Sequence, residues 1–546
     1  MLRHHRRTSL AVRATTLAAL LLTGFALIPN AAPNAPLALH KVGSYDSGLG
    51  AGAAEIPAFD AVSQRVFVVN ADAATVDIVD LSVPAAPTLV SAIDIALLFS
   101  DATFQAAPNS VAVSQGLVAV AVERKDALGR HGEGRIAFFD AAGNLIDQAV
   151  AGALPDMVTF SPDGRYALSA DEGEPSPDYS FDPEGSVTIV ETERVRLALA
   201  NPQIAGQFPL LPRHTKRASF ARFNNQKAQL QAAGVRIYGP NASVAQDVEP
   251  EYIAIPDGSI YAYVTLQEAN AVAMVNMVTG IVARITPLGF KDWTSSALDA
   301  SDRDNAILIQ PWPVHGMYQP DAIAAFRIGS QRYFITANEG DAREYTTFAE
   351  EARVKNMNLD ATAFPNAATL KLDPNLGRLT CTTSLGDTDN DGDFDQLYTL
   401  GGRSFSIFRA GNSGVLTRVF DSGDQLEQLT AALVPTRFNG DPVFDTRSDN
   451  KGPEPEGVTT GVINGRTYAF LGLERTGGVM MFDVTNPNAP QFVQYVNTSS
   501  VSGSTQTGDV SPEGLVFVPA SESPNGIPLL IVAFEVSGTV AVFEVR

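Results

Sequence analysis

A pairing of proline with an acidic residue recurs along the chain, each time directly before a short apolar run. Full copies stand at Pro155-Asp156, Pro250-Glu251, Pro320-Asp321, Pro455-Glu456 and Pro512-Glu513, and degenerate copies at Ala54-Glu55 and Pro108-Asn109. After each copy come an apolar segment, a turn of Gly, Asp, Ser or Asn, and a second segment rich in β-branched and aromatic residues. This order is typical of a β-hairpin. The chain is therefore predicted to fold into a series of similar antiparallel sheets.

Third strands are predicted after several hairpins, for example in GRIAFFD (134–140) and GTVAVFEV (538–545). Seven such units predict an all-β fold, a seven-bladed β-propeller. The last unit ends after its third strand, whereas the segment LALHKVGSYD (37–46) has no partner nearby in the sequence. We expect this N-terminal strand to close the ring, which makes residues 38–546 a single β-propeller domain.

Two long intervals interrupt the spacing of the units. The first, at about 194–246, includes the helix-like SFARFNNQKAQLQAAG, and the second, at about 342–446, is rich in Asp, Asn and Gly. Because such long connections rarely lie inside a compact repeat, they are predicted to be insertions between blades that cover one face.

A second set of acids ends the second strand of several units, at Glu172, Glu268, Glu339 and Glu474. Because a hairpin returns to the side from which it started, both sets are expected at one mouth of the channel. Acids at such junctions often only fix turns by accepting backbone hydrogen bonds. Many carboxylates together, however, repel each other by several kcal/mol unless a cation or bases neutralise them. The expected metal ligands of this carboxylate ring are Glu55, Asp156, Glu172, Glu251, Glu268, Asp321, Glu454 and Glu513.

Basic residues stand close to these acids in the sequence. Arg343, Arg403, Arg475 and Lys451 are predicted to bind the oxygens of a phosphate group or another anion. The acids Glu456, Glu339 and Glu474 are the candidate catalytic residues. HExxH motifs, paired cysteines and histidine clusters are absent from the sequence, which disfavours zinc. Oxygen ligands favour calcium, with magnesium as a possible second ion.

A separate acidic stretch lies in the second predicted insertion, DTDNDGDFD (387–395). Alternating aspartates followed by Gly392 match the first half of an EF-hand loop, but Tyr398 stands where the final glutamate belongs. The stretch is either a solvated turn or a loop stiffened by calcium through Asp387, Asp389, Asp391 and Asp393.

The N-terminus is typical of an export signal. Basic residues precede the apolar run LAALLLTGFALI (17–28), and small residues follow it, which predicts a signal peptide over residues 1–32. The pair Arg6-Arg7 leaves twin-arginine export as an alternative to the general route. Cleavage removes four arginines and takes the net charge from −22 to about −26, which disfavours nucleic acid and anionic membrane surfaces as partners. No second apolar span is evident, so we expect a periplasmic or secreted protein without integral membrane association.

Several long motifs together resemble the choice-of-anchor I family of exported β-propeller proteins. They include GALPDMVTFSPDGRYALSADEGEPS, RSDNKGPEPEGV, AFLGLERTGGVMMFDVTNP and SPEGLVFVPA. The family includes proteins described as atypical alkaline phosphatases, and the Pro-Glu-Gly motif is also similar to that of esterase-like phytase propellers. The resemblance implies an exported propeller that uses calcium and acts on phosphate esters.

Two classes of function follow from these observations. The first is a calcium-dependent phosphomonoesterase, similar to alkaline phosphatase, that binds a small phosphate ester or another anionic ligand. The alternative is a non-catalytic adhesion or scaffold propeller in which calcium only stabilises the fold.

Overall fold

The computed structural model describes residues 37–99, 101, 103–204, 210, 212–411 and 413–546. The predicted signal peptide, 1–32, lies outside these residues. Within the described residues, no helix is long and apolar enough to cross a membrane.

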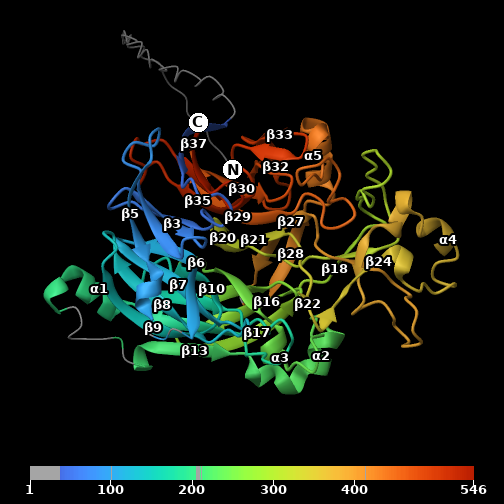
Figure 1. Ribbon diagram of the computed structural model, residues 1–546, viewed down its shortest axis with the longest axis horizontal. Helices are drawn as coiled ribbons and strands as arrows, with labels where there is room; N and C mark the ends of the chain where they lie inside the picture. Colours follow the sequence, from blue (N-terminus) through green and yellow to red (C-terminus); the bar gives the residue numbers. More distant parts are fainter. Residues whose placement is uncertain (1–36, 100, 102, 205–209, 211, 412) are drawn as a thin grey trace, which may run out of the picture. The chain divides into compact units, whose positions relative to one another are not determined.

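Four-stranded antiparallel sheets dominate the described residues (Figure 1). There are seven of them among the described residues, so the fold is all-β as predicted. In order across each sheet, the strands are β2 (Pro57–Asp60), β3 (Arg65–Asn70), β4 (Thr75–Asp80) and β5 (Thr88–Asp94); β6 (Phe104–Ser114), β7 (Leu117–Asp126), β8 (Glu133–Asp140) and β9 (Leu145–Ala153); β10 (Pro155–Phe160), β11 (Tyr166–Asp171), β12 (Ser186–Glu191) and β13 (Thr215–Ser219); β14 (Pro250–Ala254), β15 (Tyr261–Leu266), β16 (Ala271–Asn276) and β17 (Ile281–Pro287); β20 (Ile323–Ile328), β21 (Gln331–Asn338), β27 (Ser404–Ala410) and β28 (Leu416–Asp421); β29 (Pro455–Ile463), β30 (Arg466–Leu473), β31 (Val479–Asp483) and β32 (Gln491–Val496); and β35 (Pro512–Val518), β36 (Leu529–Phe534), β37 (Thr539–Val545) and β1 (Leu39–Asp46).

The last of these sheets joins the two ends of the described chain. Strand β1 pairs antiparallel with β37, from Leu39 opposite Val545 to Asp46 opposite Thr539. The predicted pairing of residues 37–46 with the last strand is therefore observed.

The first strand of each sheet contacts the first strand of the next sheet. These contacts run from β2 to β6, β10, β14, β20, β29 and β35, and then from β35 back to β2. Glycine is required where two such strands come closest, because a Cβ on Gly457 would lie 2.1 Å from the carbonyl oxygen of Glu513. Likewise, a Cβ on Gly514 would lie 2.4 Å from the ring of Pro57. The glycine of the Pro-Glu-Gly motif thus allows neighbouring sheets to approach.

The cores lie between the sheets. Every residue of β11 and β36 is buried, whereas β5, at the far edge of its sheet, is mostly exposed. Central strands are covered on both faces, which explains why their sequences are continuously apolar rather than alternating. Buried aromatic side chains fill these interfaces, as where Phe405 packs 4.7 Å from Phe482 between ring centroids.

Both predicted insertions contain strands that belong to the sheets. Strand β13 lies in the first interval, and β27 and β28 lie in the second. The insertions are therefore shorter than predicted. The sequence did not reveal these strands, because each sheet is completed only after the chain has left it for a long connection and returned.

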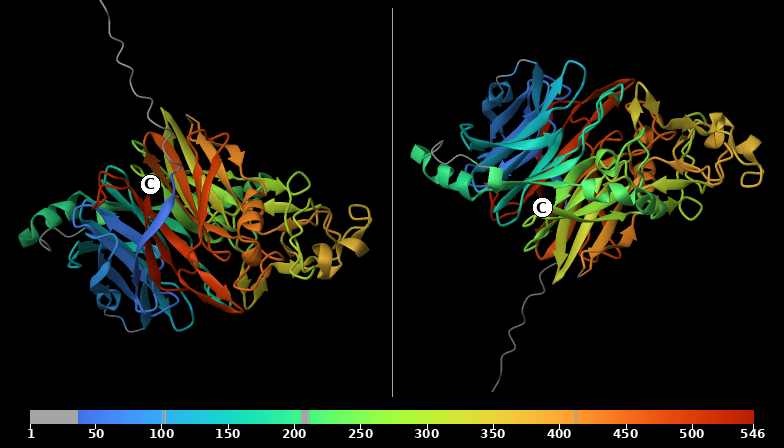
Figure 2. Two further views of the ribbon diagram at one scale, coloured as in Figure 1. Left: turned by 90° about the horizontal axis from the view of Figure 1, so that it is seen from above. Right: turned by 90° about the horizontal axis from the view of Figure 1, so that it is seen from below.

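The remaining elements lie mainly within these intervals, and residues 350–400 extend away from the four-stranded sheets (Figure 2). A five-stranded sheet contains β18 (Phe290–Asp292), β19 (His315–Met317), β26 (Tyr398–Thr399), β25 (Thr380–Thr382) and β24 (Glu351–Arg353). Two short hairpins are β22 (Glu344–Tyr345) with β23 (Phe348–Ala349), and β33 (Ser500–Ser502) with β34 (Thr505–Thr507). The helices are α1 (Glu193–Ala200), α2 (Lys227–Ala232), α3 (Val244–Asp247), α4 (Ala367–Leu370) and α5 (Gln425–Leu433), with short turns η1 (Ile95–Leu98), η2 (Pro202–Ile204), η3 (Pro212–His214), η4 (Ala221–Gln226), η5 (Val354–Asn356), η6 (Asp373–Gly377) and η7 (Pro435–Arg437).

Candidate functional site

Most acids of the Pro-acid pairs lie at an irregularity near the start of a strand. The residue before each proline is left-handed, with φ of 49° at Leu154, 34° at Glu249, 40° at Gln319, 51° at Glu454 and 59° at Ser511. The pairing register shifts just after four of these residues, between Pro155 and Met157, Pro250 and Ile253, Pro455 and Val458, and Pro512 and Leu515. It also shifts at the degenerate copy, between Pro108 and Ser110, whereas Asp321 stands before the start of β20. Such bulges redirect a side chain away from the sheet. Left-handed non-glycine residues also cost about 1 kcal/mol or more, so their repetition indicates a selected feature.

Side chains from the Pro-acid pairs and their degenerate copies meet in a cavity of about 240 Å³. An acidic or amide side chain reaches its lining from within or just before the first strand of five of the seven sheets, namely Glu55, Asn109, Asp156, Asp321 and Glu513. Tyr252 and Gly457 also line it. The structure thus brings together four of the acids that the sequence predicted as metal ligands.

The cavity acids are held in an environment that disfavours their charge. Burial, together with the charges of Glu513 and Glu535, raises the pKa of Glu55 to about 8. Burial and the charge of Glu535 raise the pKa of Glu513 to about 8 as well. Burial raises the pKa of Asp156 to about 6, with a contribution from Glu174. Without a cation, Glu55 and Glu513 are therefore mostly protonated at neutral pH, whereas Asp156 is mostly charged.

A first acidic cluster, Glu172–Glu251–Glu268, has carboxylate oxygens within 4.8 Å of one another. Glu251 and Glu268 are only 8% and 5% exposed, and Oε2 of each has no hydrogen-bond partner. Burial and the charges of Glu268 and Glu172 raise the pKa of Glu251 well above its ordinary value. Burial raises the pKa of Glu268 to about 7 despite the charge of Arg343. This cluster lacks a direct basic partner in the described part of the chain and therefore fits a cation.

A second acidic cluster, Glu339–Glu454–Glu474, is built from acids that are paired with bases. Nζ of Lys451 lies 2.6 Å from Glu339, and Nη2 of Arg475 lies 2.7 Å from Glu474. Burial opposes the charge of Glu454, but Lys451 and Arg447 hold its pKa below the ordinary value. The bases neutralise much of this cluster, so it fits a cation less well than the first.

Glu456 precedes the cavity-lining residue Gly457 and interacts with acids of both the second acidic cluster and the cavity. Burial and the charges of Glu474 and Glu513 raise the pKa of Glu456 well above its ordinary value. Its Oε2 is buried and without a hydrogen-bond partner. The segment Pro-Glu-Pro-Glu (453–456) therefore holds two different carboxyl groups. Glu454 is paired with basic side chains, whereas Glu456 is surrounded by other acids.

Two of the predicted anion-binding residues are engaged elsewhere. Arg403 is fully buried and donates to Glu427 and to the carbonyl oxygens of Asp299, Ser448 and Asn450. The prediction that Arg403 binds phosphate is wrong, because its donating Nη atoms are used to join chain segments.

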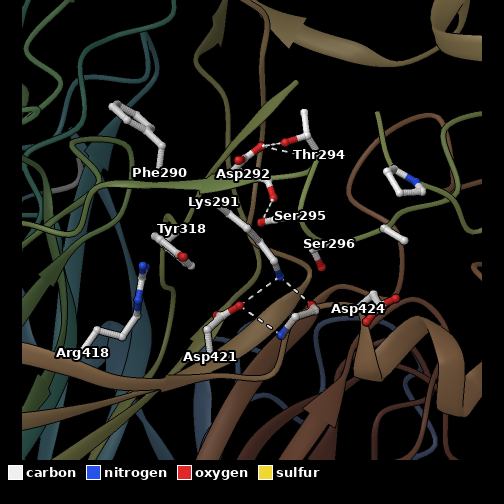
Figure 3. A pocket seen from close by; sticks show the side chains of 13 residues that line it. Phe290, Lys291, Asp292, Thr294, Ser295, Ser296, Tyr318, Arg418, Asp421 and Asp424 are labelled. Carbon is white, nitrogen blue, oxygen red and sulfur yellow. Dashed lines mark hydrogen bonds and ion pairs between the residues drawn. The ribbon is translucent and has the colours of Figure 1, made fainter. Parts of the chain in front are cut away.

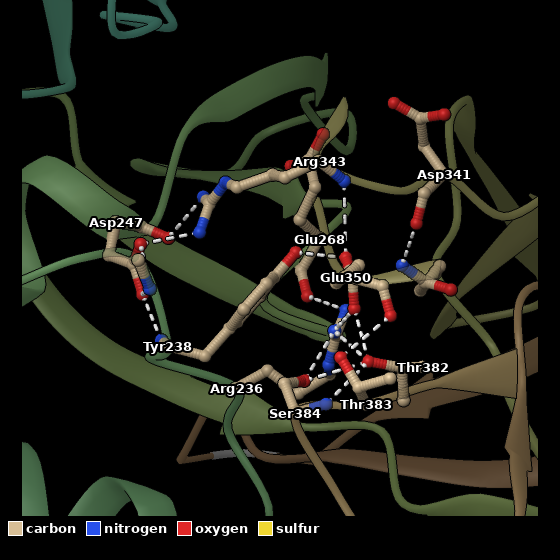
Figure 4. A network of polar contacts seen from close by, with 12 residues as sticks. Arg236, Tyr238, Asp247, Glu268, Asp341, Arg343, Glu350, Thr382, Thr383 and Ser384 are labelled. Atoms are coloured by element: carbon tan, nitrogen blue, oxygen red, sulfur yellow. Dashed lines mark hydrogen bonds and ion pairs between the residues drawn. The ribbon is translucent and has the colours of Figure 1, made fainter. Parts of the chain in front are cut away.

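Arg343 belongs to a buried network between the two insertions (Figure 4). Its guanidinium pairs with Asp247 and with Glu249 at 2.6 Å. The prediction for Arg343 is likewise wrong, since all three of its nitrogens have acceptors. In the same network, Arg236 pairs with Glu350, both side chains being buried.

The acidic stretch 387–395 is an exposed loop of the second insertion. Carboxylate oxygens of Asp387, Asp389 and Asp395 lie within 4.8 Å of one another, and those of Asp360, Asp393 and Asp395 form a second such group. Asp391 joins neither group and instead donates its backbone N–H to Asp387 at 3.2 Å. The structure thus does not bring the four predicted ligands to one point.

Several residues near the site were missed by the sequence reasoning. Glu174 and Asp341 each follow a predicted acid by two residues, in Glu172-Gly-Glu174 and Glu339-Gly-Asp341. This repeated acid-Gly-acid pattern was a usable signal. Tyr252, in contrast, lines the cavity from a position that resembles an ordinary strand residue.

The repeated four-stranded sheets and the central acidic residues define a β-propeller with an acidic cavity. The choice-of-anchor I domain model matches residues 55–487, and the chain belongs to this family. Choice-of-anchor domains are typically found in exported surface proteins.

Two curated relatives match parts of the chain. Gigasin-3a from Magallana gigas is 31% identical over 188 residues, which cover 31% of this chain and 65% of the relative. A mesenchyme-specific cell surface glycoprotein from Strongylocentrotus purpuratus is 28% identical over 288 residues, which cover 46% of this chain and 36% of the relative. The chain thus spans less than two thirds of either relative. Among solved structures, Kuenenia stuttgartiensis hydrazine synthase aligns with a TM-score of 0.45 and 11% identity, over 90% of this chain and 96% of the other.

Proposed function

We propose that the chain is an exported, calcium-dependent phosphomonoesterase whose site lies at the central cavity. The observation that carries the proposal is the convergence of buried carboxylates from several sheets on one cavity of about 240 Å³. Such a concentration of negative charge is costly unless a cation neutralises it. Export would place the protein in the periplasm or outside the cell, where calcium is available.

The seven sheets are, in this proposal, the blades of one closed ring. The cycle of contacts from β2 through β35 and back to β2 supports it. The pairing of β1 with β37 supports it as well, because it unites both ends of the chain in one sheet. A closed ring explains how acids distant in sequence reach a common axis.

Calcium fits the first acidic cluster and the adjoining cavity best. Glu172, Glu251 and Glu268 would hold it, since two of them carry buried oxygens without partners and carboxylates are the ligands that calcium prefers. Glu55, Asp156, Asp321 and Glu513 offer a second set of oxygens in the cavity. When bound, calcium would polarise the phosphoryl group and stabilise developing negative charge.

The second acidic cluster would orient the phosphate ester. Arg475 is one-third exposed, and its only close ion pair among the described residues is the one from Nη2 to Glu474 at 2.7 Å, so its guanidinium keeps donors for a phosphate oxygen. Lys451 supplies a second positive charge beside Glu339. Glu456 would act as the general base at alkaline pH with calcium bound, since its raised pKa keeps it protonated otherwise. Glu339 and Glu474 hold these two bases in place.

Removal of calcium is expected to make the protein less stable, and increasingly so as the pH rises. Without a cation, Glu55 and Glu513 have pKa values of about 8 in the folded protein, above the ordinary value of 4.5. Between these values the folded state binds more protons than the unfolded chain, so the free energy of unfolding falls as pH increases from about 4.5 to 8. Calcium at a hundred times its dissociation constant should restore about 3 kcal/mol.

Thermal unfolding with chelator, and then with excess calcium, across this pH range measures the effect. A melting temperature that neither chelator nor calcium changes at any pH contradicts the calcium site.

Replacing Arg475 by alanine is expected to weaken substrate binding. Loss of a charge-assisted hydrogen bond should raise KM for a phosphomonoester by about 10–100-fold. Arg327, an exposed residue of β20, provides the matched control, and Arg327→Ala should leave KM unchanged. Steady-state kinetics of both variants give the comparison. Equal KM values for wild type and Arg475→Ala would remove Arg475 from the site.

A second candidate function is a calcium-stabilised adhesion or scaffold protein. It is favoured by the similarity to a cell surface glycoprotein and by the engagement of Arg343 and Arg403 in the protein interior. Both functions predict stabilisation by calcium, whereas only the enzyme predicts turnover. Calcium-loaded protein that leaves a broad panel of phosphate esters intact would favour the scaffold.

A further inference from the structure

A groove of about 670 Å³ lies apart from the acidic cavity (Figure 3). One wall is β18 with the loop that follows it, residues 290–297, and the other is the end of β28 with the turn after it. Tyr318 lies between them. None of its lining residues lines the acidic cavity.

The inner end of the groove is built around Lys291, which is 4% exposed. Its Nζ donates to the carbonyl oxygens of Gly402 and Gly423, at 2.8 and 2.5 Å, and lies 3.2 Å from Oδ1 of Asp421. The charge of Lys291 is thus neutralised by groups of the protein itself. Lys291 therefore gives the inner end of the groove a polar surface, but its charge is not available to pair with an anionic ligand.

The walls combine donors, acceptors and aromatic surface. The guanidinium of Arg418 lies 4.5 Å above the ring of Tyr318 and has no ion-pair partner in the described ranges. Asp292 is exposed and accepts hydrogen bonds from Thr294 through Oδ1. Asp424 accepts only from Gln428 at 3.2 Å in the described part of the chain. Ser295 and Ser296 add hydroxyl groups, and Phe290 adds an aromatic ring.

We infer that this groove binds a saccharide. Vicinal hydroxyl groups can donate to Asp292 and Asp424 while accepting from Arg418, and the apolar face of a sugar ring can lie on Phe290 or Tyr318. Three carboxylates in the lining oppose a phosphate ligand, and the density of polar groups opposes a lipid. The volume is in the range of small-molecule sites and accommodates an oligosaccharide of a few rings.

The tryptophans of the chain provide a local probe. There are two, Trp293 and Trp312. Trp293 lies 4.4 Å from Nζ of Lys291, and Trp312 follows the lining residue Pro311. Saccharide binding in the groove should therefore change the intrinsic fluorescence, whereas binding at the acidic cavity should not.

The test is a fluorescence titration of the full chain with neutral oligosaccharides, such as malto- and cello-oligosaccharides, and with oligogalacturonates. Arg418→Ala and Asp424→Asn are expected to weaken binding at least tenfold. The matched control is Arg409→Ala, an exposed arginine on β27 outside the groove, which should bind as wild type does. Because three carboxylates line the groove, the neutral oligosaccharides are expected to bind more tightly than the oligogalacturonates.

Two results would overturn the inference. One is the absence of a fluorescence change with every saccharide of the panel. The other is saccharide affinity that both groove variants retain in full. Because neither Arg418 nor Asp424 lies at the acidic cavity, this outcome is independent of whether the protein hydrolyses phosphate esters.

Discussion

Glutamine at position 456 is expected to reduce the turnover of p-nitrophenyl phosphate by about 10²–10⁴-fold, the range for loss of a general base. Glu456 is a buried carboxyl group next to the cavity-lining residue Gly457, and its raised pKa makes it a strong base once calcium and alkaline pH have removed its proton. Glu456→Gln keeps the shape of the side chain and removes only this capacity. Steady-state kinetics at alkaline pH with calcium measure the effect, and KM should change little.

The same substitution is expected to have the opposite effect on stability. Glu474 and Glu513 both disfavour the charge of Glu456, so a neutral side chain relieves repulsion. In chelator at pH 8, Glu456→Gln should unfold at a temperature equal to or above that of wild type. Glu133→Gln, at an exposed side chain that does not line the cavity, controls for the loss of one acid, so turnover should stay unchanged and stability should change by no more than about 1 kcal/mol. Full activity in Glu456→Gln would exclude the proposed role.

Breaking the buried pair between Arg236 and Glu350 is expected to destabilise the protein by about 3–5 kcal/mol. Glu350 accepts hydrogen bonds from Arg236, from the hydroxyl of Tyr238 at 2.5 Å and from Thr382 (Figure 4). Glu350→Gln leaves the guanidinium of Arg236 buried without a counter-charge. Denaturant-induced unfolding measures the loss.

An exposed pair provides the control for this prediction. Arg217 and Glu133 lie 3.0 Å apart with side chains 42% and 60% exposed, so Glu133→Gln should cost no more than about 1 kcal/mol. Equal losses in the two variants would mean that the buried pair has no special role.

Arg236 also donates to the carbonyl oxygen of Glu268 at 2.7 Å. Glu350→Gln is therefore expected to weaken stabilisation by calcium as well.

The sequence predicted the features that depend on local patterns. Strands, turns and acid positions recur with each Pro-acid pair because hairpin formation depends on residues close to one another in the chain. The family was also recognisable, because its motifs are long and contiguous. Even the pairing of residues 37–46 with the last strand was predictable, since both segments lacked a partner.

The tertiary structure alone decided which charges are free. Arg343 and Arg403 resembled site residues because acids stand near them in the sequence. Their partners Glu249 and Glu427, however, lie 94 and 24 positions away. In the same way, the sequence predicted one ring of equivalent acids, but the structure places these acids in three different environments. Some line the cavity, some form a cluster without direct basic partners, and some form a cluster paired with Lys451 and Arg475. Whether a carboxylate is charged, paired or available to a cation depends on burial and on neighbours in space, neither of which follows from its position in a repeat.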